Sequence, residues 1–350
     1  MNATSSSAFA PGRVELLGNH TDYNEGLVLG AAIDRGLRVE GTRRDDERIA
    51  IRSTTLGTVE IDARELRPLE DKRWANYVLG VASELRALGL PITGFSAEIR
   101  GDLPAGCGLS SSAALEVASA LCLLKLCDRA LPPLEIAKAC QRAEHRFAGV
   151  QSGLLDQVTS LFGKADHAVF FDCRTEEIRT VPFPPGLTLI IAESGKRRNL
   201  ASGAYNRRRE ETHAAARALG LPALRDAALE QLRALPDLLR RRATHIVGEN
   251  DRVQRALELL AAGDGAGFGS LLNESHESSK ENFENSTPEL DRLVTIAQQL
   301  PGVLGARLTG AGFGGAILVL SEASRAKTIA AELGTKSPQV MISRVAHGAR

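Results

Sequence analysis

The sequence predicts an α+β protein of two domains, and three observations support this prediction. The 350 residues are enough for two hydrophobic cores, and 43% of them are apolar, as in ordinary globular proteins. Stretches with strand-like alternation and stretches with helical spacing of apolar residues occur along the chain without repeats. The Pro- and Gly-rich run 182–186 interrupts this pattern, so we expect domains at 1–183 and 184–350.

The first elements are strands. Residues 26–61 contain short alternating pieces, and two of them, 37–40 and 49–52, flank a polar turn, which predicts an antiparallel ribbon. Residues 73–88 place their apolar side chains on one helical face before Gly and Pro end the pattern. We expect this helix to cover the sheet, and Phe95, Ala97 and Ile99 predict another strand after it.

The remaining elements follow the same two periodicities. We expect helices at 115–124, 133–147 and 154–161, and then strands at 168–172, 178–181 and 187–192. We expect residues 193–299 to be mostly helical. The tail predicts strands at 305–308, 315–320 and 340–345, with a helix at 323–333 between the last two.

A glycine- and serine-rich loop, GDLPAGCGLSSSAA at 101–114, joins the strand that ends at Ile99 to an apolar helix. This places Ser110 to Ser112 at a helix N-terminus, where unpaired N–H groups and the positive end of the helix dipole favour an anion. Gly106 and Gly108 allow the backbone to approach a ligand closely. The loop therefore predicts a site for the phosphates of a nucleotide, although Gly and Ser also form ordinary turns and caps.

The loop matches neither of the commonest phosphate motifs. It lacks the Lys of G-x-x-x-x-G-K-[ST], and it does not read G-x-G-x-x-G, so neither a Walker ATPase nor a Rossmann dehydrogenase is indicated. One of its hydroxyls, most plausibly that of Ser112, could ligate Mg²⁺, because this ion keeps most of its waters and takes few protein ligands.

A second dense group of polar residues lies near the N-terminus. In APGRVELLGNHTDYNE, at 10–25, a strand-like alternation breaks at Gly18 into the cluster 19–24. Carboxylate, amide and imidazole groups can each make directional hydrogen bonds to neighbouring hydroxyls, so the cluster is suited to binding a sugar. An Asx-rich loop that satisfies its own backbone is the alternative.

Three further features bear on chemistry. Asp156 lies near a predicted helix start, where it either stabilises the helix dipole or serves as a general base. The loop 310–315 contains four glycines and lies between two strands, so we expect its backbone to lie against a ligand or another loop. The run Arg207 to Arg209 is most simply a solvated helix face.

Composition excludes several classes of function. Lys and Arg together number 43, as do Asp and Glu, so nothing indicates binding to nucleic acid or to an anionic membrane. No apolar run approaches the roughly 20 residues of a membrane span, and the first residues lack the pattern of a secretory signal. The five cysteines show no metal-binding spacing. We therefore expect reduced thiols and a cytoplasmic protein.

Three motifs together resemble a known family. PGRVELLGNHTDYNEG at 11–26, LPAGCGLSSSAALEVA at 103–118 and LTGAGFGGA at 308–316 resemble, in order, the three signatures of the GHMP small-molecule kinases, and the first resembles the galactokinase signature. Other similar segments extend the resemblance over nearly the whole chain. They are WANY at 74–77, GLLDQ at 153–157, FDCR at 171–174, YNRRR at 205–209, ESH at 274–276 and PELD at 288–291.

The resemblance implies a two-domain GHMP kinase fold, with a ribosomal-S5-like N-terminal domain and a ferredoxin-like C-terminal domain that carries inserted helices. It implies ATP and Mg²⁺ as cofactors, and direct in-line phosphorylation of the anomeric (C1) hydroxyl of galactose by a transferase. We expect this enzyme to be a monomer. By similarity, Asp156 would take the proton of that hydroxyl. Arg13 would keep the carboxylate ionised and help to neutralise the transferred phosphate.

The resemblance also implies the binding residues. Sugar contacts would come from Asn19, His20, Asp22, Gly153 and Tyr205. Nucleotide contacts would come from Trp74, Gly106, Gly108, Ser110, Ser111, Ser112, Gly310 and Gly312, with Ser112 also at the metal.

One departure from the family pattern concerns the sugar. Galactokinases usually have Asn where this chain has Glu15, and Glu where it has Asn19, and the usual Glu receives the 6-hydroxyl of the sugar. A neutral Asn19 would admit galacturonate or another galactose modified at C6 or C2. If Glu15 and Asn19 approach each other, however, the exchange preserves a shared hydrogen bond and galactose remains the substrate.

Two rival functions stay open at this stage. A non-catalytic regulator derived from a kinase would bind galactose and ATP without turnover, and the intact Ser110–Ala114 motif, Arg13 and Asp156 disfavour it. A different GHMP kinase would act on mevalonate, homoserine or an inositol-like alcohol. The sequence His20-Thr21-Asp22-Tyr23 disfavours that alternative.

Overall fold

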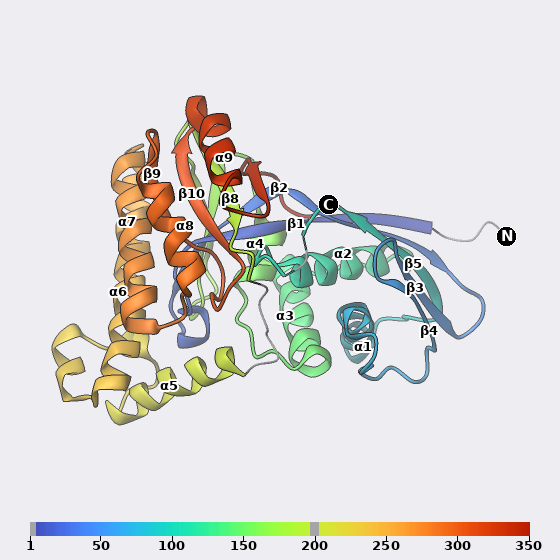
Figure 1. The fold of residues 1–350 in the computed structure, drawn as a ribbon. Helices are drawn as coiled ribbons and strands as arrows, with labels where there is room; N and C mark the ends of the chain where they lie inside the picture. The colour runs from blue at the N-terminus through green and yellow to red at the C-terminus, as the bar shows by residue number, and fades with distance from the viewer. Residues whose placement is uncertain (1–4, 105, 197–202) are drawn as a thin grey trace.

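The computed structural model describes residues 5–104, 106–196 and 203–350. Within these residues the chain forms a seven-stranded sheet and a four-stranded sheet, each flanked by helices (Figure 1). The strands of the first sheet are β1 (Ser5–Leu17), β2 (Leu27–Arg43), β3 (Arg48–Ser53), β4 (Gly57–Asp62), β5 (Phe95–Gly101), β6 (His167–Asp172) and β7 (Ile178–Pro182).

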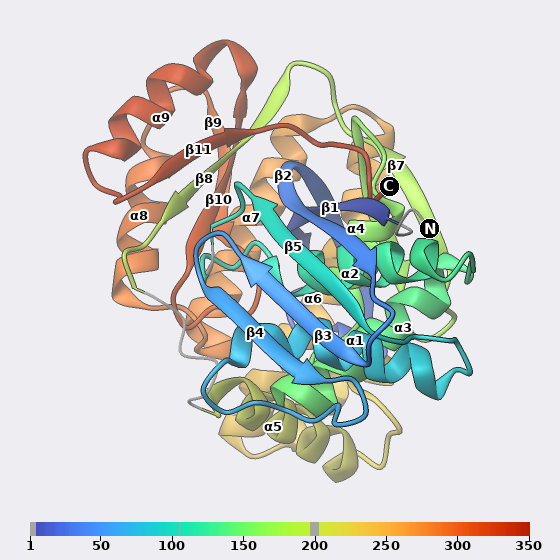
Figure 2. The ribbon, with the colours of Figure 1, turned by 90° about the vertical axis from the view of Figure 1, so that its right-hand side faces the viewer.

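The long strand β2 organises the first sheet. It pairs with β1 along its length, with β6 near its start and with β5 near its end, and all three pairings are antiparallel. The strand order is β4-β3-β5-β2-β6-β7, and Figure 2 shows β4, β3, β5 and β2 side by side.

The predicted antiparallel ribbon is wrong in one respect. Strand β5 lies between β2 and β3, antiparallel to β2 and parallel to β3, so residues 37–40 and 49–52 do not pair with each other. The polar turn does reverse the chain, but the periodicity of a strand does not identify its neighbour. The sequence also gave no sign that β1 begins as early as Ser5.

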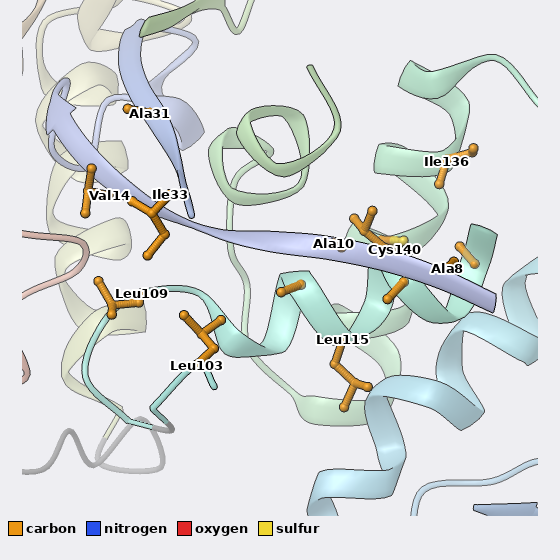
Figure 3. Packing of buried hydrophobic residues seen from close by; sticks show 14 of the residues in the cluster. Ala8, Ala10, Val14, Ala31, Ile33, Leu103, Leu109, Leu115, Ile136 and Cys140 are labelled. Atoms are coloured by element: carbon orange, nitrogen blue, oxygen red, sulfur yellow. The ribbon is translucent and has the colours of Figure 1, made fainter. Parts of the chain in front are cut away.

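Helix α2 (Ser111–Leu126) lies at the centre of the first half and is buried on nearly every side. Such a helix is apolar all round, and small side chains let its neighbours come close. In Figure 3, β1 with Ala8 and Ala10 crosses one side of α2, Leu115 points away from β1 on the other side of the helix, and Cys140 of α3 lies beside β1. The neighbouring helices are α1 (Asn76–Ala87), α3 (Pro133–Ala143), which continues as a π-helical turn at Glu144–Ala148, and α4 (Leu155–Phe162).

The second sheet has the order β11-β8-β10-β9 and is antiparallel throughout. Alternate residues of its central strands are buried on both faces, Leu189 and Ile191 on one side and Ile190 and Ala192 on the other. Its strands are β8 (Leu187–Glu193), β9 (Val303–Leu308), β10 (Ala316–Glu322) and β11 (Val340–Ser343). The helices of this half are α5 (Ala204–Ala218), α6 (Asp237–Ala261), α7 (Gly265–Ser278), α8 (Pro288–Gln298) and α9 (Ala326–Gly334).

The chain passes from one sheet to the other between Pro182 and Leu187, and the expected division at residue 183 falls in this interval. The last residues nevertheless return to the first half. Arg350 and Phe9 exchange two backbone hydrogen bonds of 2.8 and 2.9 Å, and Gly348 donates to the carbonyl of Gly163 at 2.7 Å (Figure 1).

Every helix in the described part of the chain is too short or too polar to be a membrane span. All five cysteines lie within the described residues, and no two of them form a disulfide there.

Candidate active site

A cavity of about 590 Å³ is lined by residues of both halves of the chain. All but two of the predicted catalytic and binding residues lie on its wall. They are Arg13, Asn19, His20, Asp22, Trp74, Gly106, Gly108, Ser110, Ser111, Ser112, Gly153, Asp156 and Tyr205. Gly310 and Gly312 do not line it, although Ala311 between them does.

An ion pair between Arg13 and Asp156 lies on one wall of the cavity. Arg13 Nε donates to Asp156 Oδ1 at 2.6 Å, and the Ser110 hydroxyl donates to the other carboxylate oxygen. Arg13 is 4% exposed and Asp156 is 26% exposed, so the carboxylate faces the cavity while the guanidinium is behind it. The pair joins β1 to the first turn of α4, and the hydroxyl adds the start of α2.

Three described residues of the phosphate loop (residues 101–112) have positive φ angles, and two of them are glycines. Gly106 and Gly108 both have φ of 81°, and Ser110 has φ of 54°, in the left-handed region that favours glycine. Arg13 Nη1 donates to the carbonyl of Gly108 at 2.7 Å, which fixes the loop relative to Asp156. The Ser110 side chain makes no capping hydrogen bond to α2, and Ser110, Ser111 and Ser112 at the start of this helix all line the cavity.

A buried carboxylate that we did not single out, Glu144, lies beside the start of α2. The hydroxyls of Ser152 and Ser112 donate to it, and burial raises its pKa to about 7. Gln157 links it to Glu116, because Gln157 Nε2 lies 3.5 Å from Glu144 Oε2 and 3.0 Å from Glu116 Oε2. One signal was present in the sequence, since Glu144 continues the apolar face of α3 one turn after Cys140.

The donor set at Ser112 and Glu144 fits a hard cation such as Mg²⁺, which takes one or two protein oxygens and keeps several waters. Among the described residues, no group of three or more His, Cys, Asp or Glu side chains is placed to hold a metal ion.

The polar turn (residues 18–27) forms the opposite end of the cavity. Two of its side chains, those of Asn19 and His20, form hydrogen bonds to other groups of the protein. Asn19 is 0% exposed, and its amide donates to Glu15 Oε1 at 2.7 Å and to the carbonyl of Gly310 at 2.9 Å. The His20 ring lies 2.6 Å from the Tyr23 hydroxyl and 3.0 Å from the carbonyl of Ala311.

These contacts explain the glycine loop 310–315. Its carbonyls accept from the polar turn, and a Cβ at Gly312 would overlap the backbone of Asn285. The loop therefore packs against the turn rather than against a ligand in the cavity, apart from Ala311.

Asp22 and Gly153 meet directly at this end of the cavity. A Cβ at Gly153 would overlap the Asp22 carboxylate, so only glycine leaves room for it. Burial raises the pKa of Asp22 to about 7, and the nearby charge of Asp156 adds to the shift. The Tyr205 ring lies 5.1 Å from that of His20 and borders the same space.

The far end of the cavity is apolar, and most of its residues were not singled out. It includes Trp74, whose indole nitrogen is buried without a hydrogen-bond partner. Its apolar wall residues include Leu37, Leu56, Tyr77, Ile99, Leu103 and Leu115, and the polar residues Ser53, Thr54, Thr55 and Arg100 also line the cavity. Strand and helix patterns identify such side chains as buried, but they do not separate the wall of a cavity from its surrounding core.

Comparison with known proteins agrees with this geometry. Three family models match the chain. The model of the galactokinase galactose-binding signature matches residues 2–43, that of the GHMP kinases N terminal domain matches residues 76–164, and that of the GHMP kinases C terminal matches residues 256–339. Galactokinase of Roseiflexus sp. (strain RS-1) is 44% identical over 333 residues, covering 93% of this chain and 85% of its own length. Human galactokinase is 44% identical over 330 residues, covering 91% and 84%.

The crystal structure of Lactococcus lactis galactokinase complexed with galactose superimposes with a TM-score of 0.94 at 34% identity, over 99% of this chain and 95% of the other. Methanococcus jannaschii mevalonate kinase shares the fold at 21% identity, with a TM-score of 0.73. With the sequence match, the superposition and the cavity in agreement, the chain belongs to the galactokinase family of the GHMP kinases.

Proposed function

We propose that the protein transfers the γ-phosphate of ATP directly to the C1 hydroxyl of galactose, with Asp156 as the general base. The ATP-dependent phosphorylation of galactose is the activity of its family, and one observation supports the proposed chemistry most directly. Arg13, Asp156 and the start of α2 meet at one cavity, where the Arg13 to Asp156 distance is 2.6 Å.

In the proposed reaction the C1 oxygen attacks the γ-phosphorus, and the bond to the bridging oxygen breaks, releasing ADP. Asp156 accepts the hydroxyl proton, and the guanidinium of Arg13 holds its carboxylate in place through the ion pair. Arg13 and the N-terminus of α2 also offset negative charge on the transferred group.

The nucleotide would lie along the phosphate loop and the apolar wall. The N–H groups of Ser111 and Ser112 suit phosphates, and Trp74 lies on the adjoining apolar wall, where its ring would border a base. We propose that Ser110 contributes mainly by holding Asp156, because its hydroxyl is engaged there. For Gly310 and Gly312 we propose support of the polar turn instead of direct nucleotide contact.

Ser112 and Glu144 would hold Mg²⁺ with the nucleotide phosphates. When bound, the ion supplies positive charge to those phosphates. The chain's own part is to present a hydroxyl and a carboxylate side by side at the start of α2. Because the cavity and all these groups belong to one chain, we propose that a monomer is active.

At the sugar end the contacts support galactose over a 6-carboxylate sugar. The Asn19 amide is 2.7 Å from Glu15, so the exchanged pair keeps a shared hydrogen bond. Asp22 and Asp156 both line this end, and their carboxylates would repel an anionic substrate. Asp22, Gly153 and Tyr205 remain to contact the hydroxyls of a neutral sugar.

The first prediction concerns substrate choice. Initial rates of ADP release at fixed MgATP should rank galactose above galacturonate, N-acetylgalactosamine, glucose and arabinose. We expect kcat/KM for galacturonate to be lower by about tenfold or more, because like charges are brought together in a partly buried site. Equal rates for galacturonate would contradict our account of the sugar end. ADP release with none of the sugars would favour a non-catalytic regulator.

The second prediction concerns the base. Asp156→Asn should lower kcat by about 10²- to 10⁴-fold, because the amide cannot accept the proton, while the affinity for ATP stays nearly unchanged. The matched control is Asp128→Asn, an exposed residue after α2 at φ of 52°, which Asn tolerates. Turnover near the wild-type level in Asp156→Asn would rule out a general-base role.

The third prediction concerns Gly153. In Gly153→Ala the new methyl group must displace the Asp22 carboxylate, so galactose affinity should fall by about tenfold or more with little change in ATP affinity. Isothermal titration with each ligand measures both. Gly334→Ala is the control, because a Cβ there meets no other atom within 4 Å. The assignment of Asp22 to the sugar fails if Gly153→Ala binds galactose normally.

The fourth prediction concerns pH. With a pKa of about 7, Asp22 is mostly protonated at pH 6 and mostly ionised at pH 8 in the free protein. Sugar hydroxyls donate to the ionised form, so its proton must leave before galactose binds. We expect the galactose Kd, measured without nucleotide, to be about tenfold higher at pH 6 than at pH 8.

Asp22→Asn should bind more weakly and lose this pH dependence, which separates the contribution of Asp22 from that of Glu144. A pH dependence that persists unchanged in Asp22→Asn would assign it to another group.

A further inference from the structure

We propose that helix α6 holds the polar turn (residues 18–27) in its binding shape from both ends, so that His245, Glu249 and Asn250 are positioning residues for galactose. The inference rests on the proposed function of this turn. None of the three residues lines the cavity, and all three lie more than 200 positions from the turn in sequence.

Glu249 holds the start of the turn. It is 0% exposed, and its Oε2 accepts the backbone N–H groups of Gly18 at 2.9 Å and Asn19 at 2.8 Å. Its Oε1 accepts from Arg252 Nε at 2.6 Å. Burial alone would raise the pKa of Glu249, but Arg252 and Arg307 hold it well below its ordinary value. A fully charged carboxylate therefore binds two backbone donors, and such hydrogen bonds are the stronger kind.

His245 completes the same end. Its Nε2 lies 3.1 Å from the carbonyl of Asn19, and its Nδ1 lies 3.0 Å from the Ser278 hydroxyl. Burial lowers the pKa of His245 to about 3, so the ring is neutral and has one donor and one acceptor. The carbonyl requires the donor, so Nε2 carries the proton and Nδ1 accepts from Ser278. The ring also stacks on Phe283 at 4.4 Å.

Asn250 holds the other end of the turn. Its Oδ1 accepts the backbone N–H of Leu27 at 2.8 Å. A Cβ at Gly26 would press against this oxygen, so the chain passes close to α6 here. Helix α6 therefore contacts the turn where it leaves β1 and where it enters β2.

The turn needs external support because its backbone is strained. His20 and Glu25 have φ of 62° and 58°, in the left-handed region that side chains other than glycine rarely adopt, at a cost of about 1 kcal/mol or more for each residue. Asp22 lies between these two residues, so its position at the cavity depends on both. Anchors at the two ends keep the strained form without touching the ligand.

The test compares Glu249→Gln and Asn250→Ala with wild type. Glu249→Gln puts an amide where Gly18, Asn19 and Arg252 all require an acceptor. We expect its KM and Kd for galactose to rise about tenfold or more, and those of Asn250→Ala to rise severalfold. The KM for ATP should stay within about twofold in both. Glu258→Gln, an exposed residue on the same helix, should match wild type throughout.

A merely structural role would lower the amount of active enzyme or kcat without separating the two KM values. Unchanged galactose constants in folded variants, or equal changes in the constants for galactose and ATP, would overturn the inference. If Glu249→Gln does not fold, Asn250→Ala decides the question, because it leaves the buried charges in place. Wild type that fails to bind galactose would overturn the proposed function itself, and this inference with it.

Discussion

The ion pair between Arg13 and Asp156 is the contact on which the geometry of the active cavity depends. Arg13 is almost fully buried, and an unpaired guanidinium in that position would cost several kcal/mol. One of its nitrogens is bonded to the carboxylate and another to the carbonyl of Gly108, so a single side chain sets the distance between the proposed base and the phosphate loop. Because α2 is packed on nearly all sides, this arrangement has little freedom to relax.

The two halves of the chain are joined most firmly at the sugar end. The end of β1 carries Glu15, which accepts from the buried Arg307 at 3.0 Å, and Thr309 bonds to the backbone of Glu15 in both directions. Glu249 of helix α6 also accepts hydrogen bonds from the backbone N–H groups of Gly18 and Asn19, which follow β1. Movement between the halves at this end would break buried charged contacts.

The sequence predicted most elements, and local motifs together with the resemblance to the GHMP kinases predicted most of the residues that meet at the cavity. Ser111 does begin a helix, and Asp156 does lie in the first turn of another. What depended on distant packing was not predictable. Glu144 reaches the cavity from the end of α3. Glu249 accepts a hydrogen bond from the backbone of Gly18, although its helix carries no recognised motif. Strand β5 lies between β2 and β3. Periodicity indicates burial without naming the neighbour.

The exchange of acid and amide at positions 15 and 19 follows from the same packing. The carboxylate at 15 lies beside Arg307, where its charge is balanced. The amide at 19 donates to Glu15 and to the carbonyl of Gly310, while its oxygen accepts from Asn285 at 2.9 Å. A carboxylate at 19 has no proton to donate and would oppose oxygen to oxygen at two of these contacts. Once Glu occupies position 15, the buried hydrogen bonds therefore require an amide at position 19, irrespective of the sugar.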